Sequence, residues 1–181
     1  MSPQRPVDLA VPVSAVDHSL GPDHAPVTIL EYGDFECPTC KQAAPAVKLL
    51  LERFASRVRF VYRHFPLEQP HPHALGAAQA AECAAGQGKF WQMHDLLFAN
   101  SQHLARRNLQ SYAASLGLDL ARFNAELDDQ VYLQRIREQM DGARASGVRG
   151  TPGFFVNGVI QDVSFGLQGL SQATEAALHA R

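Results

Sequence analysis

A Cys-Pro-Thr-Cys segment at the junction of an expected strand and an expected helix restricts the fold more than any other feature of this sequence. The segment is Cys37-Pro38-Thr39-Cys40. Residues 27–32 before it form an apolar, β-rich run, which predicts a buried strand. Residues 38–54 repeat apolar side chains at helical spacing, and 58–62 predict a second strand. Strand, helix and strand within about 35 residues indicate a βαβ unit with parallel strands.

The rest of the chain predicts a helical block followed by a hairpin and a last helix. Residues 71–146 carry about five helical patterns and no strand signal. Asn157-Gly158 then separates two short apolar runs, a strong signal for a two-residue hairpin turn. Apolar spacing over 170–177 predicts the closing helix. The expected fold is therefore α/β, with a helical insertion between a βαβ half and a ββα half.

The expected domain boundaries follow from this order. Residues 25–70 and 147–181 would form one domain, and 71–146 the inserted helical domain. Residues 1–24 contain four prolines and are expected to form an extended arm, with a short strand at 9–13. No stretch resembles the apolar region of a signal peptide or a membrane span. The sequence thus predicts a soluble cytoplasmic protein, and a periplasmic location stays open if its start was trimmed.

Charge and cysteine count limit the possible functions. The chain has 16 Lys and Arg against 18 Asp and Glu, a net charge of −2. This balance argues against a nucleic-acid partner, because such proteins depend on a basic surface. The three cysteines are an odd number, so they cannot all pair within one chain. Cys83 lies among small residues of an expected helix and is interpreted as a buried, inert side chain, with a third redox thiol as the alternative.

A Cys-x-x-Cys pair at the start of a helix suits thiol–disulfide chemistry. Free backbone N–H groups there favour a thiolate on Cys37, which we expect to be the exposed nucleophile, whereas Cys40 would resolve the mixed disulfide. The helix dipole supplies only about 0.3–1 kcal/mol, less than one pKa unit. Hydrogen bonds to the sulfur must therefore supply the rest of any large pKa decrease.

Half of a zinc site is the structural alternative for the same pair. A closed zinc site needs two further ligands. Cys83 is single, and His71 and His73 flank a proline at a spacing that is unusual for ligands. The sequence therefore predicts no metal and no organic cofactor. Trp91, Met93 and Phe98 are assigned to the core. Arg63 and His64 end the second strand and could approach the site, and the remaining histidines are assigned to the surface.

Two segments resemble the DsbA-like thiol–disulfide oxidoreductases, a branch of the thioredoxin superfamily. Residues 30–40 resemble the active-site strand and turn of that family, and 147–158 resemble its cis-proline loop and following hairpin. The helical block resembles the family's helical insertion, so the likeness covers residues 25–181. The dipeptide Pro38-Thr39 departs from the Pro-His of the best-known oxidising members, which leaves the redox potential open.

The resemblance implies roles for three more residues. Pro152 would follow a cis peptide bond, and the backbone of Thr151 would pair with an extended substrate segment. Glu31, six positions before Cys37, matches an acidic residue thought to relay protons to the buried cysteine. A carboxyl group inside an apolar strand should have a raised pKa. The alternative is that Glu31 faces solvent.

The sequence thus predicts an enzyme, a protein disulfide oxidoreductase or isomerase with a thioredoxin-like fold. Its partners would be protein or peptide thiols and disulfides and a redox recycling partner. One alternative is a peptide-binding chaperone or adaptor with the same fold. Another is a glutathione-dependent transferase or isomerase relative, against which the intact cysteine pair argues. The direction of electron flow stays open, since potentials of such pairs span about 150 mV.

Overall fold

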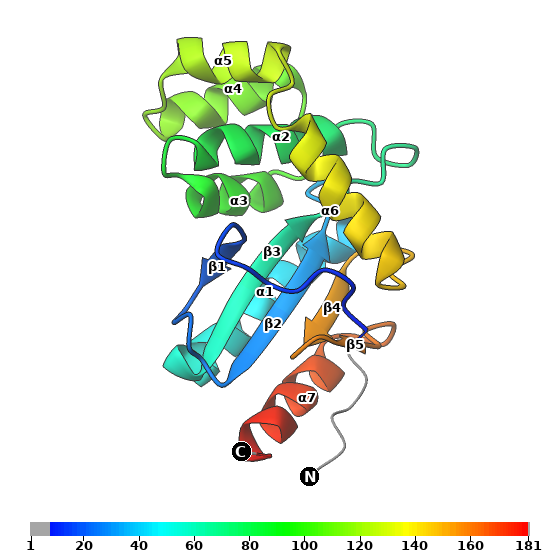
Figure 1. The fold of residues 1–181 in the computed structure, drawn as a ribbon. Helices are drawn as coiled ribbons and strands as arrows, with labels where there is room; N and C mark the ends of the chain where they lie inside the picture. The colour runs from blue at the N-terminus through cyan, green and yellow to red at the C-terminus, as the bar shows by residue number, and fades with distance from the viewer. Residues whose placement is uncertain (1–7, 181) are drawn as a thin grey trace.

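The computed structural model describes residues 8–180, in which five strands form one mixed sheet (Figure 1). The strands are β1 (His18–Leu20), β2 (Val27–Gly33), β3 (Val58–His64), β4 (Gly153–Val156) and β5 (Val159–Gln161). Their order across the sheet is β1-β3-β2-β4-β5. β2 and β3 are parallel, and the other neighbours are antiparallel. The predicted parallel βαβ unit is confirmed, and the turn at Asn157 and Gly158 has the positive φ angles of the expected hairpin.

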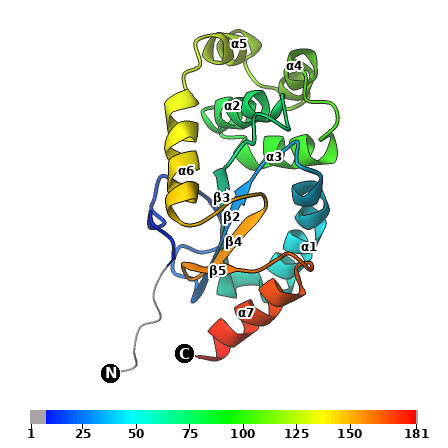
Figure 2. The ribbon, with the colours of Figure 1, turned by 90° about the vertical axis from the view of Figure 1, so that its right-hand side faces the viewer.

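Seven helices of the described residues cover this sheet on both faces and at one end. They are α1 (Pro38–Phe54), α2 (Ala74–Ala85), α3 (Phe90–Ala99), α4 (Arg106–Ser115), α5 (Leu120–Asp128), α6 (Leu133–Ala145) and α7 (Gln168–His179). A short 3-10 turn, Ala55–Arg57, follows α1. α1 and α7 lie on one face and α6 on the other (Figure 2). No helix in residues 8–180 is long and apolar enough to cross a membrane.

The burial of β2 on both faces explains its continuous apolar sequence. Ile29 belongs to the core under α1, whereas Leu30 belongs to the core under α6. Alternate residues of a strand point to opposite faces, so the odd-numbered positions of β2 share the face of α1. Glu31 is one of them, which places a carboxyl group under the helix that carries both cysteines.

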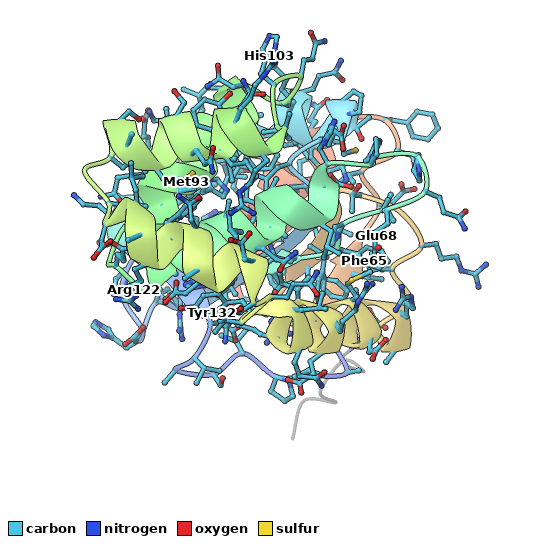
Figure 3. The ribbon with its side chains drawn as sticks, turned by 90° about the horizontal axis from the view of Figure 1, so that it is seen from above. Phe65, Glu68, Met93, His103, Arg122 and Tyr132 are labelled. Atoms are coloured by element: carbon cyan, nitrogen blue, oxygen red, sulfur yellow. The ribbon has the colours of Figure 1, made fainter. Side chains whose placement is uncertain are left out.

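Helices α2 to α5 of the insertion lie beyond the carboxyl ends of β2 and β3, and α6 returns along one face of the sheet (Figure 1). Seen from above, Met93 lies among its helices (Figure 3), and this side chain is fully buried. The assignment of Met93 and Phe98 to the core is confirmed, and Trp91 packs against that core. The surface assignment of His94 is wrong, because its ring packs against aromatic rings under α3 and is only 8% exposed.

The expected strand at 9–13 is wrong, and the N-terminal strand lies at β1 instead. Residues 1–7 of the predicted arm lie outside the described part. Side chains form hydrogen bonds with several backbone groups of 9–13 that a strand ladder would need. Ser146 accepts from the N–H of Ala10, and Arg63 donates to the carbonyls of Val11 and Pro12. Pro12 also has no N–H that could donate a hydrogen bond to a neighbouring strand. The segment is held by Arg63, which forms a buried ion pair with Asp17.

Candidate active site

The site lies where β2 ends and α1 begins, at the carboxyl edge of the two parallel strands. Asp34 organises this turn. Its carboxylate accepts hydrogen bonds from the N–H groups of Glu36 at 2.8 Å and Leu67 at 2.9 Å, and it pairs with Nδ1 of His71 at 2.8 Å. Its carbonyl accepts the N–H of Cys37. His71, weighed above as a zinc ligand, is thus used to hold the turn.

Sequence reasoning missed Asp34. Its signal was the Gly-Asp break after the strand, because Asp favours turns in which its side chain binds nearby backbone N–H groups.

Both cysteines of the pair are free thiols and both are buried. Cys37 is the N-cap of α1 and is 5% exposed, whereas Cys40 lies one turn inside and is fully buried. The expectation of an exposed Cys37 is wrong. The reason is tertiary: Thr39 and the Thr151 carbonyl lie against its sulfur, from α1 and from a loop more than a hundred residues away.

That loop carries Thr151 and Pro152, and the peptide bond between them is cis, as predicted. Sγ of Cys37 lies 3.6 Å from the carbonyl oxygen of Thr151. The Thr39 hydroxyl donates to the same oxygen at 2.9 Å and also lies 2.9 Å from Sγ of Cys37. Thr39 has one hydroxyl hydrogen for these two neighbours, so the thiolate and the carbonyl compete for it.

Hydrogen bonds at this position favour a thiolate. Together they lower the pKa of Cys37 to about 4, against the opposing effect of burial. The bond from the Cys40 thiol is the largest contribution, and Thr151, Thr39 and the Cys40 N–H contribute smaller parts of the same decrease. Burial and the bond to Cys37 raise the pKa of Cys40 far above its ordinary value. The two sulfurs therefore have opposite roles: one ionises readily and the other holds its proton.

Glu31 is buried as predicted, with 3% of its surface exposed. Burial, assisted by the nearby Cys37, raises the pKa of Glu31 to about 8. The same carboxyl contributes to the raised pKa of Cys40 after the effects of burial and of Cys37. A group with a pKa near 8 beside a thiol that must lose a proton is suited to proton exchange.

Beside the pair, a groove of about 360 Å³ runs along the cis-proline loop and the chain after β5. Thr39 and Pro152 line one part of it, and Ile160 and Val163 line another. The groove is open and partly apolar, and Phe165 next to it is fully exposed. These features suit an extended peptide with an apolar side chain.

The third cysteine lies apart from this site. Cys83 is fully buried in α2, and burial, the largest cause, raises its pKa to about 12. The prediction of a buried side chain is confirmed. A thiol that keeps its proton inside a core is a poor nucleophile.

Comparisons with known proteins agree with this geometry. A thioredoxin family model matches residues 14–176. BdbD of Bacillus subtilis superposes with a TM-score of 0.81 and 22% identity over 90% of this chain and 93% of that one. α-DsbA1 of Wolbachia pipientis superposes with a TM-score of 0.79 and 22% identity over 96% of both chains.

A protein of Salinispora arenicola described as a Na(+)/H(+) antiporter NhaA 1 is 51% identical over 172 residues, covering 94% of this chain but 26% of its own length. The chain thus spans about a quarter of the curated relatives it matches. BdbD and α-DsbA1 share the fold of this chain, and the match of the family model over most of the chain shows that it belongs to the thioredoxin family.

Proposed function

We propose that the protein exchanges disulfides with protein substrates through Cys37 and Cys40. The observation that carries the proposal is the opposite ionisation of the two sulfurs, one with a pKa near 4 and one with a strongly raised pKa. The ionised sulfur lies against the cis-proline loop, where Thr151 has backbone groups that suit pairing with an extended segment. No metal or organic cofactor takes part in this chemistry.

We further propose that oxidation of substrates is the favoured direction. A substrate thiolate attacks Sγ of Cys37 in the Cys37–Cys40 disulfide, that bond breaks, and Cys40 leaves and takes up a proton. A second substrate thiolate attacks the substrate sulfur of the mixed disulfide, and Cys37 leaves as a thiolate. The substrate loses two electrons and the pair gains them.

The magnitude of the Cys37 pKa supports this direction. A pKa near 4 stabilises the reduced pair at pH 7 by about three factors of ten, or about 4 kcal/mol, relative to a free thiol. Since about 30 mV corresponds to 1.4 kcal/mol for this couple, the thiolate raises the potential by about 90 mV. A recycling partner must then reoxidise the pair.

Glu31 is proposed as the group that exchanges the Cys40 proton. It lies beneath the pair, and its pKa near 8 is close to working pH. Thr151 and Pro152 are proposed as the substrate-binding loop, and Pro38 and Thr39 as the dipeptide that adjusts the potential.

Replacement of Cys37 by Ser tests the proposal. The variant should lose disulfide exchange with a reduced or scrambled protein substrate, and mass spectrometry of the oxidised wild type should find a Cys37–Cys40 bridge. Cys83→Ser is the matched control and should retain full activity. Full activity of Cys37→Ser would contradict the proposal that Cys37 carries out the exchange. Unchanged client binding by a Cys37→Ala/Cys40→Ala variant, with no exchange by the wild type, would favour a chaperone or adaptor instead.

The relatives named as antiporters favour a second proposal, on location. Their printed names describe membrane transporters, of which this chain matches about a quarter. We place the domain beside a membrane, on its oxidising outer side, where a disulfide can persist. A membrane-impermeant thiol reagent should then label Cys37 in intact reduced cells. If Cys37 is labelled only after the cells are opened, the domain lies in the cytoplasm, as the sequence predicts, and this proposal is wrong.

A further inference from the structure

The Tyr62 hydroxyl is a buried polar group that the chemistry above does not use. The side chain of Tyr62 is fully buried, and among the described residues its hydroxyl has no hydrogen-bond partner. Buried hydroxyls are normally paired, so an unpaired one next to a reactive site needs a reason. Tyr62 also belongs to the same packed cluster as Cys37 and Cys40.

Its strand position places Tyr62 beside Glu31. The two residues are register partners on the parallel strands β2 and β3, on the face under α1. On the other side of β2, the register partner of Glu31 is Phe154, which has no donor. At the level of this carboxyl group, Tyr62 is therefore the cross-strand neighbour that has a hydrogen to donate.

The ring of Tyr62 extends past Glu31 towards the catalytic turn. A Cβ on Gly33 would lie 2.6 Å from the Tyr62 oxygen and 2.5 Å from Cε2, so the phenol lies directly over this glycine. The ring also stacks on Phe35, two residues before Cys37, at a centroid distance of 5.3 Å. The hydroxyl thus lies over the end of β2, just before the turn that leads to the cysteine pair.

Titratable groups lie around Tyr62 on five elements and in one turn. They are Glu31 on β2, Asp34 in the turn, Cys37 and Cys40 at the start of α1, His64 on β3, His94 on α3 and His18 on β1, the register partner of Tyr62. Burial lowers the pKa of His64 and of His94, so these two are neutral at pH 7. Burial, followed by the negative charges of Glu31 and Cys40, raises the pKa of Tyr62, which therefore keeps its hydrogen.

We propose that the Tyr62 hydroxyl donates a hydrogen bond to the Cys40 thiolate as it forms in the resolving step. Cys40 gives its proton to Glu31 in its ionised, carboxylate form, and its sulfur attacks Sγ of Cys37. The Cys37–Cys40 bond forms as the bond from Cys37 to the substrate sulfur breaks, and the substrate leaves as a thiolate. The pair loses two electrons, the substrate disulfide gains them, and Tyr62 keeps its own proton throughout.

The inference rests on the proposed dithiol chemistry of Cys37 and Cys40, but it does not require a protein substrate. It also explains why the hydroxyl is retained without a partner in the resting dithiol. Such a group destabilises the fold until the anion forms. Removing it should therefore leave the thermal stability equal or higher while slowing the reaction.

Single-turnover kinetics of the full chain test this. The reduced protein is mixed with a chromogenic aryl disulfide, whose first thiolate is released when Cys37 attacks and whose second is released when Cys40 resolves. In Tyr62→Phe the second phase should be about tenfold slower, and its pH midpoint should rise by about one unit, since one hydrogen bond to an anion is lost. The first phase should not change.

Tyr32→Phe is the matched control. Tyr32 is equally buried on the neighbouring strand, but its hydroxyl lies on the opposite face and binds Arg63. Its second phase should match the wild type. A second phase in Tyr62→Phe within twofold of Tyr32→Phe, with the same pH profile, overturns the inference. If the wild type releases both aryl thiolates normally but does not exchange disulfides with protein substrates, only the proposed function is contradicted.

Discussion

Replacing Thr39 by Val tests how the pKa of Cys37 is set. Val has the shape of Thr without the hydroxyl that lies 2.9 Å from Sγ of Cys37. A hydrogen bond to a charged group contributes about 1.5–3 kcal/mol. Thr39 is exposed and shares its hydrogen with the Thr151 carbonyl, so the lower end applies. The pKa of Cys37 should therefore rise from about 4 to about 5.

This increase has opposite effects on rate at two pH values. At pH 7 about 99% or more of Cys37 is thiolate in either protein, so the rate depends on how nucleophilic that thiolate is. A thiolate of higher pKa is the stronger nucleophile, and alkylation should therefore be about threefold faster in Thr39→Val. At pH 4 the loss of thiolate decides, and the variant should react more slowly. The reduction potential should fall by about 30 mV, because the reduced pair loses stabilisation.

The assay is the ultraviolet absorbance of the thiolate across a pH titration, followed by alkylation rates at pH 4 and pH 7. Thr39→Ser retains the hydroxyl and should behave like the wild type. A Thr39→Val protein that titrates at or below the wild-type pKa, or that reacts more slowly at pH 7, would refute the reasoning.

Three further substitutions test the surroundings of the site. Gly33→Ala should lower the free energy of unfolding by about 1–3 kcal/mol in urea titrations, because its Cβ would collide with the Tyr62 ring; wild-type stability would contradict this. Glu31 has a pKa of about 8 in the folded protein against 4.5 in the unfolded chain, so folding retains a proton that the unfolded chain releases. The free energy of unfolding should therefore decline by up to about 5 kcal/mol as the pH rises from 4.5 to 8. Glu31→Gln should abolish this decline, and an unchanged pH dependence would exclude Glu31 as its source. Asp17→Asn leaves the buried Arg63 unpaired and should cost about 3–5 kcal/mol, with faster proteolysis of the N-terminal segment; equal protease resistance would show that the pair does not hold it.

Local sequence signals were sufficient where neighbours in the chain decide the structure. The Asn157-Gly158 turn, the parallel βαβ unit and the place of the cysteine pair at the start of α1 were all predicted and confirmed. The buried Glu31 followed from its position in an apolar strand. The cis bond before Pro152 came from the family resemblance.

Other features depend on contacts that the linear sequence does not contain. β1 is three residues long, and its pairing with β3 replaces the strand expected at 9–13. The burial of His94 depends on rings from the core and from α3 that pack around it. Asp34 acts through backbone groups more than thirty residues away.

The sequence alone determined that two of the three cysteines lie as a Cys-x-x-Cys pair at the start of a helix, because periodicity and turn chemistry are local properties. The tertiary structure decided how that pair is tuned. Cys37 is covered by a loop from the other end of the chain, and Tyr62 and Glu31 come together only through strand register. The physical reason is that burial and hydrogen bonding set a pKa through distances in space, and these arise only when separate segments pack together.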